Sequence, residues 1–482
     1  MFKKGKKIVA MALAAVMALS LCACGGKEDG EQASSGKTDT LKWYIMAAEP
    51  VGFDKVMAEA NKYIKEKLGV ELELICLQAA DYTQKMNMIM AAQEEFDMMW
   101  VNVGLYESNI AKGAFLPLDD YLGDTPELKA LFEDGVWDAT RVNGDIYGVP
   151  MLQVLYDQPG LWMIKSIVDK YSLDVENIKS NDDLAEIFQV VKENEPEVIP
   201  IRSDVTGYFS PYRTEVGSTG FLIDEDGKVL SLKPEAMEEK RDSKEWYAKG
   251  FYPADVTTMT DEQSLIAAQK LFSRYSRQLP GVSGKFKNSN GYDVVNVALN
   301  DGVISRKSVQ STMTVISATS KNPEKAMALL ELMQTDKYLF NLMSYGIEGE
   351  DWTKDPENEN RILREDGAYY VPEYLIGNQF LAYILPNYED TVWEETIAEN
   401  EKAVIDPNNG FAFVRDSVET ELTNLASIGQ EFGSLLSYGE EPIEDVWAKY
   451  TEKRKMAGED KVREEIQSQY DAWKATQKKK IR

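Results

Sequence analysis

The alternation of strand-like and helix-like segments at the start of the folded region most constrains the fold. Residues 40–47 (TLKWYIMA) are rich in strand formers, residues 53–68 carry apolar side chains at helical spacing, and Gly69 is placed to end that helix. The next strand-like run, residues 70–77 (VELELICL), is followed by a helical pattern over 82–92 and by a second buried run, FDMMWVNV. This order predicts an α/β fold with a parallel sheet covered by helices on both faces.

The first residues have the pattern of a secretory signal. A lysine-rich start precedes the unbroken apolar run 8–19, which is shorter than the ~20 residues of a membrane-spanning helix. The run ends in LCAC, residues 21–24, which resembles the lipobox of bacterial lipoproteins. That resemblance implies a signal peptide over 1–23, a diacylglycerol on the thiol of Cys24, and a flexible lipidated tether over 24–39. The alternative is an ordinary secreted protein with incidental cysteines.

Composition argues against several classes of function. The 81 acidic residues against 53 Lys and Arg give a net charge of −28, which repels phosphate backbones and makes nucleic acid a poor partner. The chain has no histidine, so Ser-His-Asp and Cys-His catalysis and histidine metal sites are excluded. No P-loop or GxGxxG motif occurs. We therefore expect no catalytic residue, no metal ligand and no cofactor.

Two short acidic motifs are interpreted as turns. Residues 224–228 (DEDGK) resemble a calcium loop but lack its length and its terminal glutamate, so a hairpin turn is favoured. Residues 406–410 (DPNNG) carry the Asn, Pro and Gly of a turn. Neither motif is expected to hold a ligand.

Longer phrases in a fixed order carry a family resemblance. They are residues 111–122 (AKGAFLPLDDYL), 141–150 (RVNGDIYGVP), 315–349, 410–440 and 449–474. The first three resemble the extracellular solute-binding proteins of bacterial ABC importers, in the carbohydrate-binding branch. The last two resemble a subgroup of large Gram-positive binding lipoproteins. The likeness covers almost the whole mature chain.

The resemblance implies a two-lobed, periplasmic-binding-protein-like clamp (type II), each lobe a sheet covered by helices. Ligand would bind in the cleft at the carboxyl ends of the strands, and hinge closure would present the complex to a membrane permease. We expect a monomer on the outer face of the bacterial cytoplasmic membrane. The expected division is 40–153 for the first part of lobe 1, 154–310 for the first part of lobe 2, 311–345 for the return to lobe 1, and 346–482 for the completion of lobe 2 with C-terminal helices.

A sugar offers hydroxyls at its rim and C–H groups on its faces, so its site needs hydrogen-bonding side chains and aromatic rings at strand ends and in loops. For aromatic residues on strands, packing in the core is the stronger alternative. The candidates are Trp43, Tyr44, Glu49 and Asn102 in lobe 1, Gln153, Tyr156 and Asp157 at the first crossover, Tyr208, Phe209, Tyr212, Arg213, Arg274 and Tyr275 in lobe 2, and Glu348, Trp352, Asn378 and Gln379 beyond the returning helix.

Three hypotheses follow. The favoured one is a lipid-anchored binding protein that captures a carbohydrate, an oligosaccharide above all, and delivers it to an ABC permease. The second is the same fold with a peptide or an organic anion as ligand, for which the arginines at 202, 213, 274 and 277 are suited. The third is a surface protein that binds or hydrolyses glycans through a carboxylate pair.

Overall fold

The computed structural model describes residues 38–480, with side chains up to residue 477. The compact unit described below begins at Asp39. The predicted signal peptide, Cys24 and the tether up to residue 37 lie outside the described residues.

The first sheet has the strand order β2-β1-β3-β15-β6 within the described chain. Strand β1 pairs in parallel with β2 and β3, and β15 pairs antiparallel with β3 and β6. The parallel strands predicted from the first hundred residues are therefore confirmed. The strands are β1 (Asp39–Ile45), β2 (Val70–Cys76), β3 (Met98–Val101), β6 (Gly148–Pro150) and β15 (Met313–Ile316).

Helices of this first lobe bury apolar stripes against the sheet. In α1, residues Val56, Met57, Ala60 and Ile64 are buried, and Gly69 ends the helix in the left-handed conformation, as its position in the sequence predicts. The helices of the lobe are α1 (Phe53–Leu68), α2 (Ala79–Ala91), α3 (Val103–Ile110), α4 (Pro126–Ala130), α5 (Asp134–Asp138), α12 (Pro323–Thr335), α13 (Lys337–Tyr345) and α14 (Val392–Lys402). Two hairpins, β4 (Arg141–Val142) with β5 (Asp145–Ile146) and β16 (Thr353–Asp355) with β17 (Asn358–Leu363), complete it.

The second lobe is built on a sheet with the order β13-β7-β12-β8. Its core includes Phe188, Trp246 and Phe251, whose rings meet edge to face or tilted. The strands are β7 (Gly160–Ile164), β8 (Ile199–Ile201), β12 (Leu271–Tyr275) and β13 (Val294–Ala298). The helices are α6 (Lys165–Tyr171), α7 (Asn181–Asn194), α8 (Ala236–Ala248), α9 (Glu262–Ala267) and α10 (Val282–Asn290).

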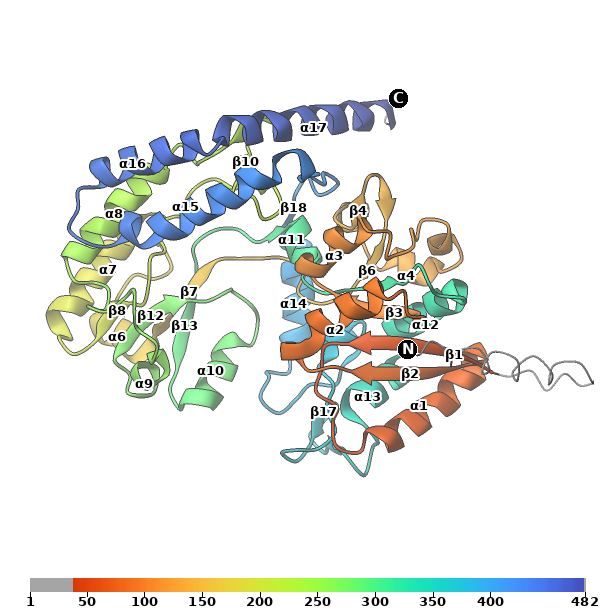
Figure 1. Ribbon diagram of the computed structural model, residues 1–482. Coiled ribbons are helices and arrows are strands. Elements are labelled where there is room, and N and C mark those ends of the chain that lie inside the picture. The colour runs from red at the N-terminus through yellow and green to blue at the C-terminus, as the bar shows by residue number, and fades with distance from the viewer. Residues whose placement is uncertain (1–37, 481–482) are drawn as a thin grey trace, which may run out of the picture. The chain divides into compact units, whose positions relative to one another are not determined.

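A small sheet and three C-terminal helices extend this lobe (Figure 1). Strands β9 (Thr214–Glu215), β10 (Leu222–Ile223) and β11 (Val229–Leu230) form the sheet, and DEDGK is the hairpin turn between β10 and β11, as predicted. The sheet shares a buried core with α15 and α17. The helices are α15 (Glu419–Ser437), α16 (Ile443–Met456) and α17 (Glu459–Lys480), and α15 packs against α8.

The lobe boundary after residue 345 differs from the expected one. Trp352, Ile362, Tyr369 and Trp393 share the buried core of Trp43, so the segment through α14 belongs to lobe 1. Only the residues beyond this helix join lobe 2. Helical spacing reports how one segment buries its own stripe and gives no information about which of two cores receives it, which is why the sequence placed the boundary too early.

Within the described residues, three segments cross between the lobes. They are the link from β6 to β7, the link from β13 to β15, and the link from α14 to α15. The second link contains β14 (Val303–Ile304) and α11 (Arg306–Val309), the third contains β18 (Val404–Ile405), and β14 pairs in parallel with β18. Two of the crossovers are therefore joined side by side.

The motif DPNNG, residues 406–410, ties these crossovers to both lobes. Asn409 Nδ2 donates to the carbonyls of Gly135 in α5 (3.1 Å) and Ile304 in β14 (3.0 Å), and its own carbonyl accepts from Arg306 of α11 (3.1 Å). Asn409 is 2% exposed. The sequence predicted a turn at this motif, and in the structure the turn also forms a junction between distant segments.

The same junction reaches the C-terminal helix. The buried carboxylate of Asp406 accepts from Tyr212 (2.6 Å) and Thr214 (2.7 Å) of lobe 2, and Asn408 accepts from the hydroxyl of Tyr470 in α17 (2.9 Å). Asn408 also donates to Thr214 (2.9 Å). The last helix of the chain is therefore hydrogen-bonded to the hinge.

We expect Asn409→Ala to lower the free energy of unfolding by about 2 kcal/mol, because the carbonyls of Gly135 and Ile304 each lose a donor at ~1 kcal/mol. Urea denaturation followed by circular dichroism measures this change. The control is Asn194→Ala, at the exposed end of α7, for which a change within about 0.5 kcal/mol is expected. Equal stability of the two variants would contradict the role given to the junction.

Candidate functional site

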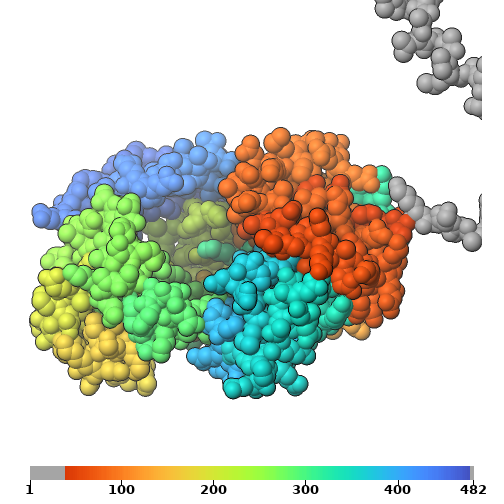
Figure 2. All heavy atoms as spheres, turned by 90° about the horizontal axis from the view of Figure 1, so that it is seen from below, coloured from red at the N-terminus to blue at the C-terminus, as the bar shows by residue number. Residues whose placement is uncertain are grey.

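The carboxyl ends of the parallel strands in lobe 1 define the edge where a ligand would be expected. Strands β1, β2 and β3 run in the same direction, so Ile45, Cys76 and Val101 end at one edge of the sheet. In Figure 1 the arrowheads of β1 and β2 point toward the elements of lobe 2, and Figure 2 shows the surface hollowed between the two groups of elements.

The two predicted strand aromatics of lobe 1, Trp43 and Tyr44, are held in packing contacts. Trp43 is fully buried in the core. Tyr44 packs edge-on against Phe96, which precedes β3, at a ring-centroid distance of 5.8 Å. The pKa of Tyr44 is raised by burial and then by the charge of Glu94, which also lies before β3. Their surroundings favour packing over contact with a ligand.

Asn102 and Glu49 follow strands and lie at the expected edge. Asn102 Oδ1 accepts from the backbone N–H groups of Gly104 (3.1 Å) and Leu105 (3.3 Å), so its side chain caps α3. Glu49 is exposed. Burial, assisted by the nearby charge of Glu49, raises the pKa of the Cys76 thiol to about 12, so this thiol stays protonated at neutral pH.

The first crossover places one buried and one exposed candidate side by side. Tyr156 is 2% exposed, and burial followed by the charge of Glu399 raises its pKa to about 12. Asp157 is exposed, and its carboxylate forms an ion pair with Arg277 at 3.2 Å. The backbone of Gln153 accepts from Asn400 of α14 (2.7 Å), which fixes the crossover to lobe 1.

The structure brings two predicted aromatics of lobe 2 together as a stacked pair. The rings of Tyr208 and Tyr275 lie 5.1 Å apart with an interplanar angle of 22°, and both residues are half-buried. Burial raises the pKa of both hydroxyls, and the charge of Asp157 raises both values further. The tyrosine pair, Tyr208 with Tyr275, therefore lies beside the first crossover.

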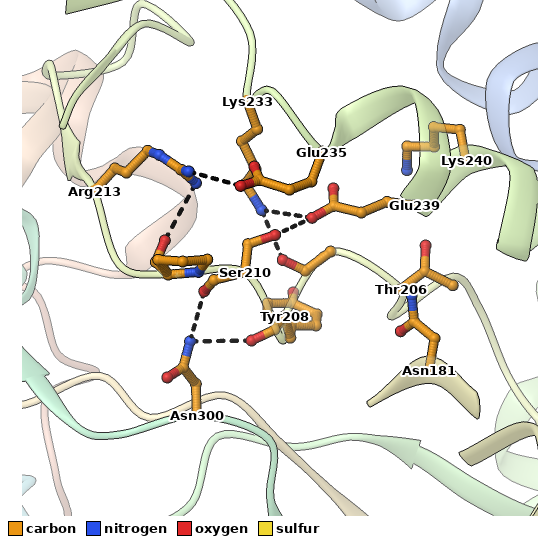
Figure 3. A network of polar contacts seen from close by, with 12 residues as sticks. Asn181, Thr206, Tyr208, Ser210, Arg213, Lys233, Glu235, Glu239, Lys240 and Asn300 are labelled. Carbon is orange, nitrogen blue, oxygen red and sulfur yellow. Dashed lines mark hydrogen bonds and ion pairs between the residues drawn. The ribbon is translucent and has the colours of Figure 1, made fainter. Parts of the chain in front are cut away.

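Polar contacts hold the loop that carries this pair (Figure 3). Asn300 Nδ2 donates to the carbonyls of Tyr208 (3.1 Å) and Ser210 (3.0 Å). Lys233 Nζ donates to the carbonyl of Gly207 (2.6 Å) and pairs with Glu239 (3.5 Å), which also accepts from Ser210. The loop is thus anchored to the β13–β14 link and to the start of α8.

Within the same loop, Arg213, Phe209 and Tyr212 are already engaged. Arg213 forms an ion pair with Glu235 at 2.9 Å, as Figure 3 shows. Phe209 packs against the core of lobe 2, and Tyr212 donates to Asp406 in the DPNNG junction. These three candidates stabilise the loop and the hinge.

The arginines considered for an anionic ligand all face carboxylates. Arg202 and Arg274 share Glu262, at 2.9 Å and 2.5 Å, and Arg213 and Arg277 pair with Glu235 and Asp157. A guanidinium already neutralised by a carboxylate has little attraction left for an anion. An anionic ligand would therefore have to compete with a carboxylate at each of these arginines.

The remaining candidates lie beyond α13. Trp352 is 6% exposed and donates to the carbonyl of Gly346 (3.0 Å), and Asn378 is buried and donates to the carbonyl of Gln334 (3.1 Å). Glu348 is exposed and lines a cavity of about 470 Å³ with Lys55 of α1. The backbone N–H of Gln379 donates to Leu152 of the first crossover (2.8 Å). Of these candidates, only Gln379 contacts the crossover.

Sequence reasoning missed two groups of residues in this region. Lys307 of α11 forms an ion pair with Glu215 (3.0 Å), and the charge of Asp157 also acts on its ammonium group. Nothing in the neighbouring sequence identifies Lys307 as a site residue. The run YYVPEY, residues 369–374, places a buried Glu373 between Tyr370 and Tyr374. Its density of aromatics around a proline is a signal that could have been used.

The described residues contain no group of three or more Cys, Asp and Glu placed to hold a metal ion. In the same part of the chain, none of the helices combines the length and the apolar character needed to cross a bilayer.

Comparison with known proteins identifies the family. The model for "bacterial extracellular solute-binding protein" matches residues 47–339, and a domain of unknown function (DUF3502) matches residues 407–475. The chain belongs to the bacterial extracellular solute-binding proteins. The resemblance inferred from short phrases of the sequence is confirmed, and the match to DUF3502 begins inside the DPNNG junction.

A sequence and a crystal structure, both from Streptococcus pneumoniae, are similar over most of the chain. A carbohydrate ABC transporter substrate-binding protein of serotype 4 is 29% identical, covering 97% of this chain and 98% of its own. The crystal structure of the N-glycan transport solute-binding protein NgtS is 27% identical, with a TM-score of 0.79, and covers 90% of this chain and 98% of its own. The two-lobed α/β fold predicted from the sequence is confirmed, and the relatives are transport proteins.

More distant solute-binding proteins share the fold. A binding protein for HMO from Bifidobacterium longum infantis is 15% identical with a TM-score of 0.63, and covers 91% of this chain and 99% of its own. At this identity the likeness shows the fold alone.

The solute-binding chain should lose stability between pH 10 and pH 12. Tyr156 keeps its proton in the folded state up to a pKa of about 12, whereas the unfolded chain releases it near pH 10. The folded state therefore binds more protons in this window, and the free energy of unfolding falls as the pH rises. We expect Tyr156→Phe to reduce this slope, measured by urea denaturation at pH 9, 10 and 11. An unchanged slope would contradict the assignment.

Proposed function

We propose that this protein is a lipid-anchored receptor that captures a neutral oligosaccharide between its lobes and delivers it to the permease of an ABC importer. The family consists of extracellular solute-binding proteins, and the similar proteins of S. pneumoniae are named for carbohydrate transport and N-glycan transport. The proposal adds the class of ligand, the anchor and the residues that make contact.

The tyrosine pair is the observation that carries the proposal. Two nearly parallel rings, half-exposed, offer an apolar face for the C–H groups of a sugar. Around them stand Asp157 and Lys307 from two different crossovers and Arg277 from lobe 2. A saccharide stacked on the rings would form hydrogen bonds with Asp157, Lys307 and Arg277. Since Asp157 and Lys307 lie on crossovers, the ligand would contact the hinge directly.

Charge supports a neutral ligand. The arginines of the site are held by carboxylates, and Asp157 beside the rings is itself paired with Arg277. An anionic sugar would have to displace an existing ion pair, which costs its Coulomb energy and its hydrogen bonds. Two structures of NgtS, 27% and 28% identical to this chain, are complexes with Man1GlcNAc and Man5GlcNAc, which are neutral glycans.

The mature protein is proposed to be a monomer held on the outer face of the cytoplasmic membrane by lipid on Cys24. The support is the basic start, the short apolar run and the LCAC sequence before the polar tether. Glycan capture requires no chemistry at the ligand, and we propose binding without turnover.

Isothermal titration of residues 38–482 with Man1GlcNAc and Man5GlcNAc tests the function. We expect saturable binding and, by mass spectrometry, unchanged glycan after prolonged incubation. Tyr275→Ala should weaken binding by about tenfold or more, since a stacking face is lost. The control is Tyr338→Ala, an exposed tyrosine of α13, which should bind as the wild type does. No glycan binding, or cleavage of the glycan, would overturn the proposal.

The anchor has an independent test. In a Gram-positive host, Cys24→Ala should release the protein from the membrane fraction into the medium, because the acylated thiol is lost. Cys76→Ala, which leaves the LCAC sequence intact, is the matched control and should stay with the membrane. Intact-mass analysis of a membrane-bound chain that still contains Cys22 would contradict cleavage before Cys24.

A further inference from the structure

The segment of lobe 1 around YYVPEY, residues 369–374, has the features of a binding surface separate from the tyrosine pair. Tyr370, Tyr374 and Tyr388 lie near Glu373: Tyr370 is hydrogen-bonded to its carboxylate, and Tyr374 is the next residue along the chain. Burial and, after it, the charge of Glu373 raise the pKa of all three hydroxyls. Glu373 itself is 2% exposed. Its carboxylate accepts from Tyr370 (2.8 Å) and from Gln379 (3.4 Å). We name these three tyrosines with Glu373 the lobe 1 platform.

The platform lies at the ligand edge of lobe 1. The carbonyl of Tyr374 accepts from Thr312 Oγ1 (3.4 Å), which in turn accepts from Trp100 at the carboxyl end of β3 (2.6 Å). Gln379, which contacts Glu373, is bonded to Leu152 of the first crossover. The platform is therefore fixed both to the strand ends and to a hinge segment.

The platform is also accessible. Tyr374 is 42% exposed, so its ring is open to solvent. Tyr370 and Tyr388 are half-buried beside it. The exposed ring of Tyr374 offers an apolar face, and the hydroxyls of Tyr370 and Tyr388 offer hydrogen-bonding groups beside it. A sugar-binding site requires both.

An element of lobe 2 reaches the same place. The ammonium of Lys285 in α10 lies 4.2 Å from the ring centroid of Tyr388, and Asn288 of α10 donates to the carbonyl of Asn387 (3.5 Å). Burial lowers the pKa of Lys285, and the charge of Glu373 acts in the opposite direction. A ligand on the platform would therefore have donors from both lobes within its surroundings.

We propose that the lobe 1 platform is a second saccharide subsite, which takes a neutral sugar unit beyond the one held by the Tyr208–Tyr275 pair. This proposal rests on the proposed function. Tyr374 contacts the sugar face, and the hydroxyls of Tyr370 and Tyr388 bond its rim. Glu373 is a positioning residue that holds the Tyr370 hydroxyl, and its buried negative charge disfavours a carboxylated sugar such as a uronate or a sialate. The preferred ligand is therefore a neutral oligosaccharide long enough to occupy both subsites.

Calorimetry with Tyr374→Ala on residues 38–482 tests the subsite. We expect the Kd for Man5GlcNAc to rise by about tenfold and the Kd for Man1GlcNAc to change by less than about twofold, because only the longer glycan reaches both subsites. Tyr338→Ala, a tyrosine of similar exposure on α13, is the control and should leave both values unchanged. An unchanged Kd for Man5GlcNAc, or equal losses for both glycans, would overturn the proposal.

Further binding measurements test the role of Glu373 and distinguish failure of the subsite from failure of the proposed function. Glu373→Ala should weaken Man5GlcNAc binding, and Glu373→Gln should restore it, because an amide oxygen still accepts from Tyr370; failure of the rescue would overturn the positioning role. If the wild type binds neither glycan, the proposed function fails and the subsite with it. If the wild type binds and Tyr275→Ala weakens binding while Tyr374→Ala does not, the subsite alone is overturned.

Discussion

The hydrogen bonds of Asn409 are the contact on which the arrangement of this chain depends. One buried amide joins α5 of lobe 1 to β14 of the second crossover, and its backbone accepts from Arg306 of α11. Arg306 in turn donates to Glu107 of α3 at 2.6 Å. Because a buried carbonyl that loses its donor costs free energy, these bonds hold the crossovers in one place while the sheets remain separate. The C-terminal helix joins them through Tyr470, which gives the domain of unknown function a structural place at the hinge.

The surfaces proposed to bind a sugar belong to the two lobes that this junction joins. On lobe 2, the tyrosine pair is held by a loop whose ion pairs are satisfied within the loop and α8. On lobe 1, the exposed Tyr374 follows the buried Glu373, whose carboxylate accepts hydrogen bonds from Tyr370 and Gln379. In both places the charges position aromatic rings and are themselves paired or hydrogen-bonded, so the exposed chemistry is that of neutral hydrogen bonding and apolar faces.

The successes and failures of sequence reasoning have a common physical origin. Period-two and helical patterns report the burial of one segment, and they predicted β1, α1 and β2 within a residue or two. They could not distinguish Trp43, which is buried, from Tyr275, which is half-exposed, because both lie on strands. The stacking of Tyr208 on Tyr275 joins residues far apart in the chain, and no local pattern contains that information. The boundary expected at residue 346 was wrong for the same reason, since the choice between two cores is made by distant contacts.

The sequence by itself determined the class of fold and membership in the solute-binding family, because these depend on local periodicity and on short motifs in order. It also predicts a secretory start with a lipobox-like cysteine, which lies outside the described residues. Only the tertiary structure decided which arginines are neutralised, which aromatics face outward, and that DPNNG is a junction as well as a turn. Pairing, exposure and hydrogen bonding between distant segments are properties of the folded chain, and they exist only once the segments have been brought together.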